Sequence, residues 1–102
     1  MRILVFFDLP VARKSDRKQY AKFRKYLLND GYDMIQYSVY CRICNGNDGM
    51  QKYLERLNRN LPPKGSVRVL TITDKQYARM KLLVGLPTPT EKKLNSTQLS
   101  LF

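Results

Sequence analysis

The sequence contains no histidine, no tryptophan and only two cysteines. Without histidine the chain has no imidazole to act as a general base, to complete a Ser-His pair or to ligate a metal. Cys41 and Cys44 form a lone C-x-x-C motif, and residues at this spacing on a strand face opposite sides. That placement disfavours a disulfide or a shared metal, and no second cysteine pair completes a zinc site. Any catalysis would therefore depend on carboxylates, hydroxyl groups and water.

Long apolar runs are absent as well. No stretch approaches the roughly 20 residues of a membrane span, and the opening ILVFF segment is too short for a secretory signal. Together with the small number of cysteines, this predicts a protein of the reducing cytoplasm. The length of 102 residues fits one domain and is too short for two ordinary ones.

Acidic residues are scarce, because eight Asp and Glu stand against 19 Lys and Arg and leave a net charge of +11. Such an excess repels itself and usually reflects a polyanionic partner. Nucleic acid fits best, since Lys and Arg neutralise its phosphates. A membrane surface is the second interpretation, but it requires a basic helix with a broad exposed apolar face. A third is a basic protein whose charge has no specific partner.

The apolar patterning predicts one domain over residues 1–85 and an arm over 86–102. Runs of β-branched and aromatic residues indicate strands, and apolar positions three and four apart indicate helices. With both helices on one face of an antiparallel sheet, the resulting βαββαβ order is the ferredoxin-like α+β fold. The expected elements are strands over 2–8, 66–73 and 80–84, two strands within 32–44 broken near 36–38, a helix over 15–29, a helix that Asn47 or Asp48 caps and Pro62 stops, and a helical turn over 74–79.

Each long helix has a predicted inward face. The first is expected to start with Ser15 or Asp16 as its N-cap and to close at Gly31. Its inward residues are predicted to be Tyr20, Ala21, Phe23, Leu27 and Leu28. The second helix carries a clearer stripe, formed by Met50, Tyr53, Leu54, Leu57 and Leu61.

Basic residues crowd the first helix and recur on the second. A solvated helix face usually mixes both signs of charge, whereas Asp16 is the one acid among seven cations here. No base-reading motif accompanies them, so the pattern favours contacts to the nucleic-acid backbone over an ordinary solvated face. The predicted nucleic-acid-binding residues are Arg13, Lys14, Arg17, Lys18, Lys22, Lys25, Lys52, Arg56 and Arg59.

Asp8 ends the first predicted strand, directly after its apolar run. A carboxylate at the mouth of a core is a candidate ligand for Mg²⁺ or Mn²⁺, which prefer oxygen and activate water against a phosphodiester. One aspartate per chain is too few, although a two-fold dimer could bring two copies of Asp8 around one metal. The alternative is that Asp8 caps the loop at 10–13 or pairs with an arginine, and the spacing slightly favours this alternative.

Two tyrosines of the third predicted element leave two interpretations open. Tyr37 and Tyr40 could stack on bases. Strand tyrosines more often pack in a core or an interface. The nearby Gly46 and Gly49 belong to a turn and do not match a phosphate-binding loop.

The opening ILVFFDLP, the basic first helix and the segment GYDMIQYSVYCRI together resemble the small CRISPR-associated spacer-acquisition endonucleases of the Cas2 family. The strand-end Asp8 and the run from Gln36 to Tyr40 are the best marks. The segment LTITDKQYARMKLLVG and the trailing arm are similar to members from type II systems. The resemblance extends from Met1 to about Gly85.

The resemblance implies a homodimer in which a C-terminal strand, for which residues 97–102 are suited, packs against the partner's sheet. It also implies two Cas1 integrase dimers that flank this homodimer and hold a double-stranded protospacer DNA for spacer acquisition. Family members are further described as metal-dependent endonucleases of single-stranded RNA or of DNA, which assigns Asp8 as catalytic and as a ligand of Mg²⁺ or Mn²⁺ shared between two copies. Arg17 matches a basic family position, whereas Phe7 stands where some members have Tyr and Met34 where some have Arg.

Overall fold

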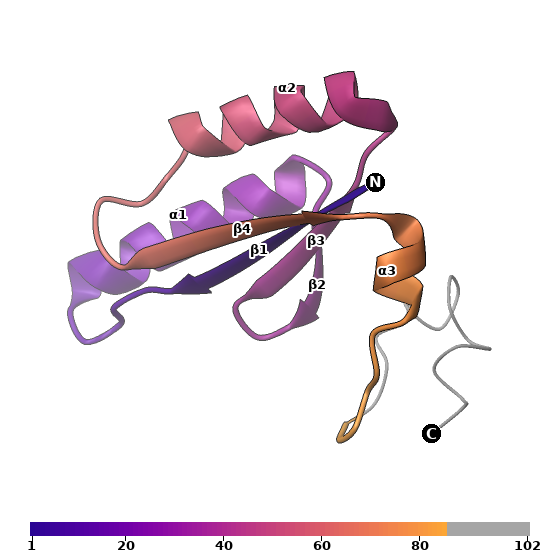
Figure 1. Ribbon diagram of the computed structural model, residues 1–102. Helices are drawn as coiled ribbons and strands as arrows, with labels where there is room; N and C mark the ends of the chain where they lie inside the picture. Colours follow the sequence, from indigo (N-terminus) through magenta and orange to yellow (C-terminus); the bar gives the residue numbers. More distant parts are fainter. Residues whose placement is uncertain (86–102) are drawn as a thin grey trace.

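Four strands and three helices form the part of the chain, residues 1–85, that the computed structural model describes (Figure 1). Their order and the antiparallel pairing of the strands confirm the predicted ferredoxin-like α+β fold. The elements are β1 (Arg2–Asp8), α1 (Lys14–Asn29), β2 (Asp33–Gln36), β3 (Val39–Ile43), α2 (Gly46–Arg59), β4 (Ser66–Ile72) and α3 (Asp74–Ala78).

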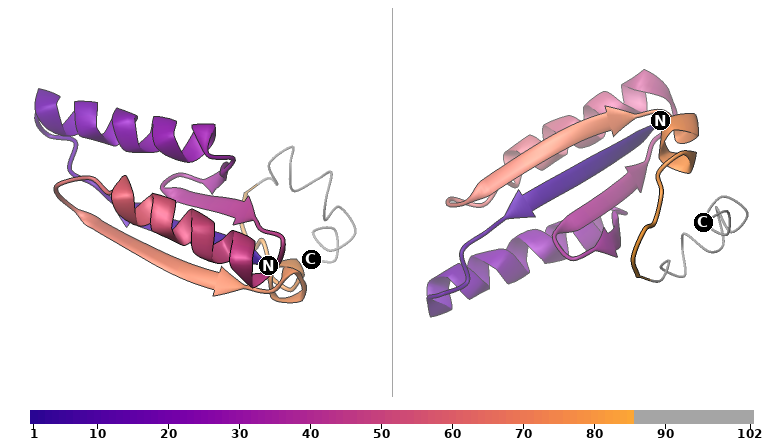
Figure 2. Two further views of the ribbon diagram at one scale, coloured as in Figure 1. Left: turned by 90° about the horizontal axis from the view of Figure 1, so that it is seen from above. Right: turned by 60° about the horizontal axis from the view of Figure 1, so that its bottom comes forward.

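The strand order in the sheet is β2-β3-β1-β4, so β1 is central and pairs on both sides. Successive side chains of a strand face opposite sides of the sheet. Ile3, Val5 and Phe7 accordingly lie in the cluster that α1 and α2 cover, while Leu4 and Phe6 lie in a second cluster on the other side. Figure 2 shows both long helices on the same side of the sheet. The side without these helices is called the open face below.

Phe7 packs against three other aromatic rings in the helix-side core. Its ring lies 5.2 Å from that of Phe23 and 5.9 Å from that of Tyr20, both on α1, and 5.6 Å from the ring of Tyr40 on β3. Edge-to-face and offset pairs at these separations add to the stabilisation that apolar burial provides. These aromatic contacts fix α1 against the centre of the sheet.

The inward faces of the helices differ from the prediction at three residues. Ala21, Leu28 and Leu61 are exposed. On α1, the inward stripe instead runs through Tyr26, which packs against the core one turn after Phe23. Leu61 lies past the last residue of α2, where the chain no longer follows the helical spacing that the prediction assumed.

Both long helices begin a few residues earlier than predicted, so both predicted N-caps are wrong. α1 begins at Lys14, and the Asp16 carboxylate accepts a hydrogen bond of 3.3 Å from the backbone N–H of Arg13. Asp16 thus satisfies one of the free N–H groups at the helix start from inside the first turn, rather than from the cap position. α2 begins at Gly46, before Asn47 and Asp48, and its N-cap residue makes no side-chain cap bond.

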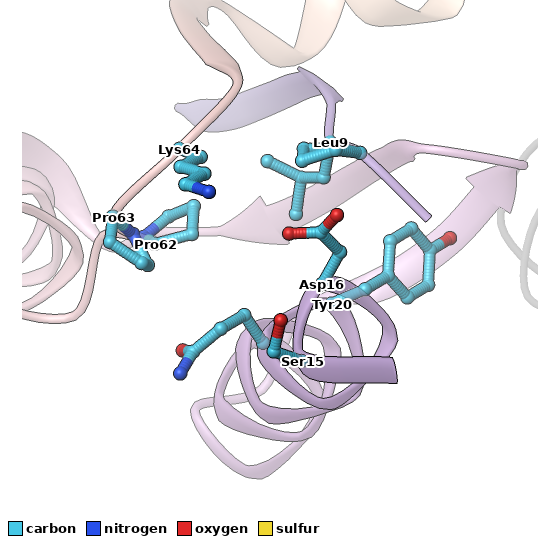
Figure 3. A pocket seen from close by; sticks show the side chains of 9 residues that line it. Leu9, Ser15, Asp16, Tyr20, Pro62, Pro63 and Lys64 are labelled. Carbon is cyan, nitrogen blue, oxygen red and sulfur yellow. The ribbon is translucent and has the colours of Figure 1, made fainter. Parts of the chain in front are cut away.

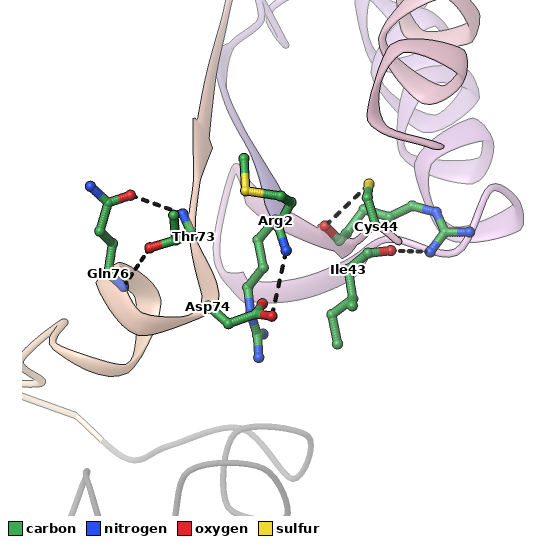
Figure 4. Close-up of polar contacts among 8 residues, drawn as sticks. Arg2, Ile43, Cys44, Thr73, Asp74 and Gln76 are labelled. Carbon is green, nitrogen blue, oxygen red and sulfur yellow. Dashed lines mark hydrogen bonds and ion pairs between the residues drawn. The ribbon is translucent and has the colours of Figure 1, made fainter. Parts of the chain in front are cut away.

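α3 is held against one end of the open face by Arg2 (Figure 4). The Arg2 Nε donates to Asp74 at 3.1 Å, and its guanidinium lies 4.0 Å from the centre of the Tyr77 ring. Partial burial alone would raise the pKa of Asp74, but the Arg2 hydrogen bond and the N-terminal ammonium together lower it. Tyr77 is buried beside Leu4 and Cys41, so α3 covers only this corner of the face.

The short strand predicted over residues 80–84 is absent. These residues have no regular secondary structure, and Leu83 and Val84 are 84% and 92% exposed. A strand needs a hydrogen-bonded neighbour, and within residues 1–85 no sheet edge pairs with this segment. The predicted arm over 86–102 and its pairing strand over 97–102 lie outside the described residues.

Gly65 provides a test of how tightly the loop before β4 packs against β1. Its φ is +93°, and a Cβ there would lie 2.6 Å from the Asp8 carbonyl oxygen and 2.8 Å from Leu9. We expect Gly65→Ala to lower the free energy of unfolding by about 2 kcal/mol or more, because backbone strain and a backbone clash add together. Urea unfolding followed by circular dichroism measures this.

Gly49→Ala is the matched control, because nothing lies within 4 Å of a Cβ at this position. It lies within α2, so alanine should stabilise the protein by roughly 0.5–1 kcal/mol. A Gly65→Ala protein as stable as wild type would show that the loop does not constrain the end of β1.

Candidate nucleic-acid interface and Asp8 site

Asp8 is the last residue of β1 and is exposed at the end of the central strand. It pairs across the sheet with Ser66 of β4. Its carboxylate makes no hydrogen bond or ion pair with any residue of the described range, so neither the loop cap nor the arginine pair considered from the sequence forms. The carboxylate oxygens are therefore available to an external ligand.

The described residues of a single chain do not supply a complete metal site around Asp8. Among residues 1–85, no group of three or more histidine, cysteine or acidic residues is placed to hold a metal. An exposed, unpaired carboxylate suits a hard cation such as Mg²⁺. A second copy, nucleic acid or water could supply further ligands.

Asp8 borders a hollow of about 350 Å³ at the end of the sheet. The turn between β2 and β3 forms one wall, where Ser38 adopts a φ of +64° and its carbonyl accepts the Phe7 N–H at 3.0 Å. β4 forms the other wall with Ser66 and Arg68. Because Arg68 is opposite Phe6, its side chain shares the open face with Asp8. Sequence analysis missed Arg68, although a cation alternating with Leu70 and Ile72 was a visible signal.

The two tyrosines considered for base stacking differ sharply in exposure. Tyr37 is 86% exposed at the hollow, whereas Tyr40 is 1% exposed in the helix-side core. Phe7 is likewise buried, and Met34 packs against the same core. Only Tyr37 among these side chains can therefore meet a ligand without rearrangement of the core.

Most of the predicted nucleic-acid-binding residues are exposed on the helical side of the molecule. They are Arg13 at the start of α1, Lys14, Arg17, Lys18, Lys22 and Lys25 on α1, and Lys52 and Arg59 on α2. The apolar stripes of both helices are occupied by the core, which removes the exposed apolar face that a membrane-surface helix requires. No helix within residues 1–85 has the length and apolar character to cross a bilayer.

Lys22 and Arg59 meet in one groove between α1 and the end of α2, together with Gln19 and Asn60. The groove continues into a neighbouring pocket, because Gln19 and Pro62 line both. Figure 3 shows this pocket between the start of α1, which contributes Ser15, Asp16 and Tyr20, and the loop that carries Lys64. The groove therefore brings one basic residue of each long helix together.

Two of the predicted contact residues are already engaged within the fold. Arg17 donates to the carbonyl oxygens of Val11 and Ala12, both at 3.1 Å, and holds the loop before α1. Arg56 is half-buried and pairs with the buried Asp30 at the end of α1. Arg56 thus stabilises the fold through its ion pair with Asp30, whereas Arg59, on the same helix, is exposed.

Asp30 organises a polar cluster between α1 and α2. It accepts hydrogen bonds from Arg56 and, at 3.1 Å, from the Tyr26 hydroxyl. Burial, followed by the Asp30 charge and hydrogen bond, raises the pKa of Tyr26 to about 12. Burial also raises the pKa of Tyr32, whose hydroxyl is buried without a partner among the described residues. Both phenols therefore stay protonated at neutral pH, so neither tyrosine adds a charge to the cluster.

The cysteines show none of the features of a redox or metal site. Cys41 and Cys44 are free thiols, and both are buried. They lie in different apolar clusters, Cys41 with Leu4 and Tyr77 and Cys44 in the helix-side core. Burial raises the pKa of both thiols, which keeps them in the unreactive protonated form.

Comparison with known proteins connects these features to one family. Residues 1–80 match the family model described as CRISPR associated protein Cas2. The chain is 66% identical over 102 residues, the whole of both chains, to the CRISPR-associated endoribonuclease Cas2 of Acidovorax ebreus. It is 45% identical to the protein of the same name from Campylobacter jejuni, over all of this chain and 71% of that one. The fold also matches the crystal structure of Streptococcus pyogenes Cas2 at pH 6.5, with a TM-score of 0.63 at 20% identity over 82% of this chain and 100% of that one.

Substitution of Arg56 or Arg59, two arginines of α2, distinguishes a cation that stabilises the fold from a cation that lies on the surface. We expect Arg56→Gln to lower the free energy of unfolding by about 2 kcal/mol, because it leaves the Asp30 carboxylate buried without its cation. Arg59→Gln should change it by no more than about 0.5 kcal/mol. Chemical denaturation of the two variants compares them directly, and equal stabilities would contradict the assignment of Arg56 to the fold.

Proposed function

This chain belongs to the CRISPR associated protein Cas2 family, and on that premise we propose that it is a CRISPR-adaptation protein that binds nucleic acid as a homodimer. In this proposal the homodimer holds a double-stranded protospacer DNA between Cas1 integrase dimers during spacer acquisition. It also carries a metal-dependent endonuclease activity, as expected from relatives named endoribonucleases. The alternative is a ferredoxin-like interaction module without nuclease activity.

The observation that carries the binding proposal is the groove between α1 and α2, which brings a cation from each helix together. Lys22 of α1 and Arg59 of α2 line one groove, and the remaining lysines of α1 are exposed on the same helix as Lys22. Such a surface neutralises phosphates and releases counterions without reading bases. Because the helices keep their apolar stripes in the core, this face is free to serve a polyanion.

The homodimer is supported by the composition of the open face. Leu70 and Ile43 are 52% and 43% exposed there, and α3 covers only one corner. Among residues 1–85, no second layer beyond α3 covers this face, which leaves apolar area in water that a stable fold normally buries. A second copy placed against this face would bury that area and would bring two Asp8 side chains into one assembly.

The nuclease proposal rests on the unpaired carboxylate of Asp8 and its hollow. Two Asp8 side chains in a homodimer would supply oxygen ligands for one Mg²⁺ or Mn²⁺, which when bound would activate water for phosphodiester hydrolysis. The chain itself contributes the ligand, its position at the end of a rigid strand and the access from solvent. The absence of histidine from the sequence leaves Asp8 as the side chain best placed for this role.

The binding proposal predicts a specific change in salt dependence. We expect the double variant Lys22→Gln and Arg59→Gln to bind duplex DNA more weakly, and the slope of log K against log salt to become shallower by about 1–2 units, roughly one for each lost phosphate contact. Fluorescence anisotropy at several salt concentrations measures the slope. Lys75→Gln with Arg79→Gln, two exposed residues at the α3 end, removes the same charge as a control.

A slope that is the same in both double variants would show that net charge alone attracts the duplex. It would count against the groove between α1 and α2 as the contact surface.

Asp8→Asn tests the metal site, because it replaces the carboxylate by a neutral side chain of the same shape. We expect Mg²⁺-dependent cleavage of single-stranded RNA to fall by roughly 100-fold or more, the scale of losing one charge-stabilising group. Asp48→Asn, at an exposed position on α2, is the control and should cleave like wild type.

Spacer acquisition in cells, measured on the same variants, separates the two roles. Intact acquisition without cleavage would support a scaffold with a separable nuclease activity, and loss of both would make the metal site central. A wild-type protein that neither cleaves RNA nor binds duplex would leave the interaction module as the function.

A further inference from the structure

We propose that the hollow beside Asp8 is a subsite for one nucleotide of a single-stranded nucleic acid, in which the Tyr37 ring stacks on a base and the Arg68 guanidinium binds an adjacent phosphate. The proposal rests on the nuclease part of the proposed function and assigns it two residues that line the hollow at the Asp8 end of the sheet, so it requires the proposed homodimer to leave this hollow accessible at the edge of its interface. It separates single-strand recognition at the hollow from duplex recognition at the helical groove.

The backbone conformation of the turn between β2 and β3 holds Tyr37 in its exposed position. It precedes Ser38, whose φ of +64° is uncommon for a residue with a side chain. The turn is held in place because the Ser38 carbonyl accepts the Phe7 N–H at 3.0 Å. This bond ties the turn to the residue before Asp8, so Tyr37, which is 86% exposed, lines the same hollow as Asp8.

Arg68 supplies the charge on the opposite wall. It is exposed on β4 and makes no hydrogen bond or ion pair with the residues described here. Its neighbours along the same face, Leu70 and Ser66, carry no charge, so nothing within the strand uses the guanidinium. A free guanidinium with hydroxyl groups of Ser38 or Ser66 nearby matches the donors that bind phosphate and sugar oxygens.

The chemistry of the hollow favours a single strand over a duplex. An aromatic ring can stack on a base only if the base is unstacked from its neighbours, which is the rule in single strands and costs energy in a duplex. The bound phosphate would then lie beside Asp8, where the proposed metal acts. In a duplex the base faces would be occupied and only Arg68 could contribute.

The test measures binding of a short fluorescein-labelled oligoadenylate RNA by anisotropy, with EDTA present so that no cleavage occurs. Tyr37→Leu keeps an apolar side chain but removes the ring, and we expect roughly 10-fold weaker binding, within the range for loss of one stacked base. Tyr37→Phe keeps the ring and should bind within about twofold of wild type. Arg68→Gln should weaken binding and reduce the salt slope by about one unit.

Two further measurements on the same variants make the result specific. Affinity for duplex DNA should stay at the wild-type value, because the helical groove is unchanged. The oligomeric state, measured by sedimentation equilibrium, should also be unchanged. If Tyr37→Leu alters that state, Tyr37 is an interface residue and the stacking assignment is overturned.

The remaining outcomes distinguish this proposal from the proposed function. Equal binding by wild type and Tyr37→Leu, or equal losses in Tyr37→Leu and Tyr37→Phe, would overturn the subsite while wild-type cleavage and duplex binding stand. Wild-type protein that binds duplex but no single strand would overturn it in the same way. Wild-type protein that binds no nucleic acid and cleaves none would instead overturn the proposed function.

Discussion

The burial of Phe7 is the constraint on which the remaining features depend. Its ring contacts side chains of α1 and β3, so it can point only toward the helices. Because side chains alternate along a strand, this fixes Phe6 and Asp8 on the other side, at the end of the central strand. The Phe7 N–H also holds the turn that carries Tyr37. Phe7 thus sets the direction of the candidate ligand through its buried side chain and holds the turn of Tyr37 through its backbone N–H.

The molecule keeps its two proposed activities on separate faces. The helical face carries the groove of Lys22 and Arg59, and the open face carries the apolar area and the Asp8 hollow. The strand pattern of β1 produces this division, since apolar residues on both of its faces require a covering layer on each. α1 and α2 supply one layer, and within residues 1–85 the other face is covered only in part, by α3.

The sequence was sufficient for the fold because its patterns are local. Each element has its own local signal: the ILVFFD run for β1, the ending from Asn29 to Gly31 for α1 and the apolar stripe for α2. The order of these elements along the chain leaves few possible topologies. What it could not show are contacts between distant segments. Arg56 and Arg59 are both arginines near the end of α2, and the sequence does not distinguish their roles. Arg56 stabilises the fold because Asp30, at the C-terminal end of α1, lies beside it. Arg68 and Tyr37 likewise meet Asp8 only when three strands and a turn come together.

The position of β1 has a further consequence for how the protein is made. β1 leaves the ribosome before its two neighbours in the sheet, β3 and β4, and β4 follows only after α1, β2, β3 and α2. Contacts between segments so far apart close late and slow the folding of small domains. During synthesis, β1 is therefore an apolar strand with an edge that stays unpaired until β4 has been made. Nascent chains with such unpaired strands are prone to aggregate or to need a chaperone.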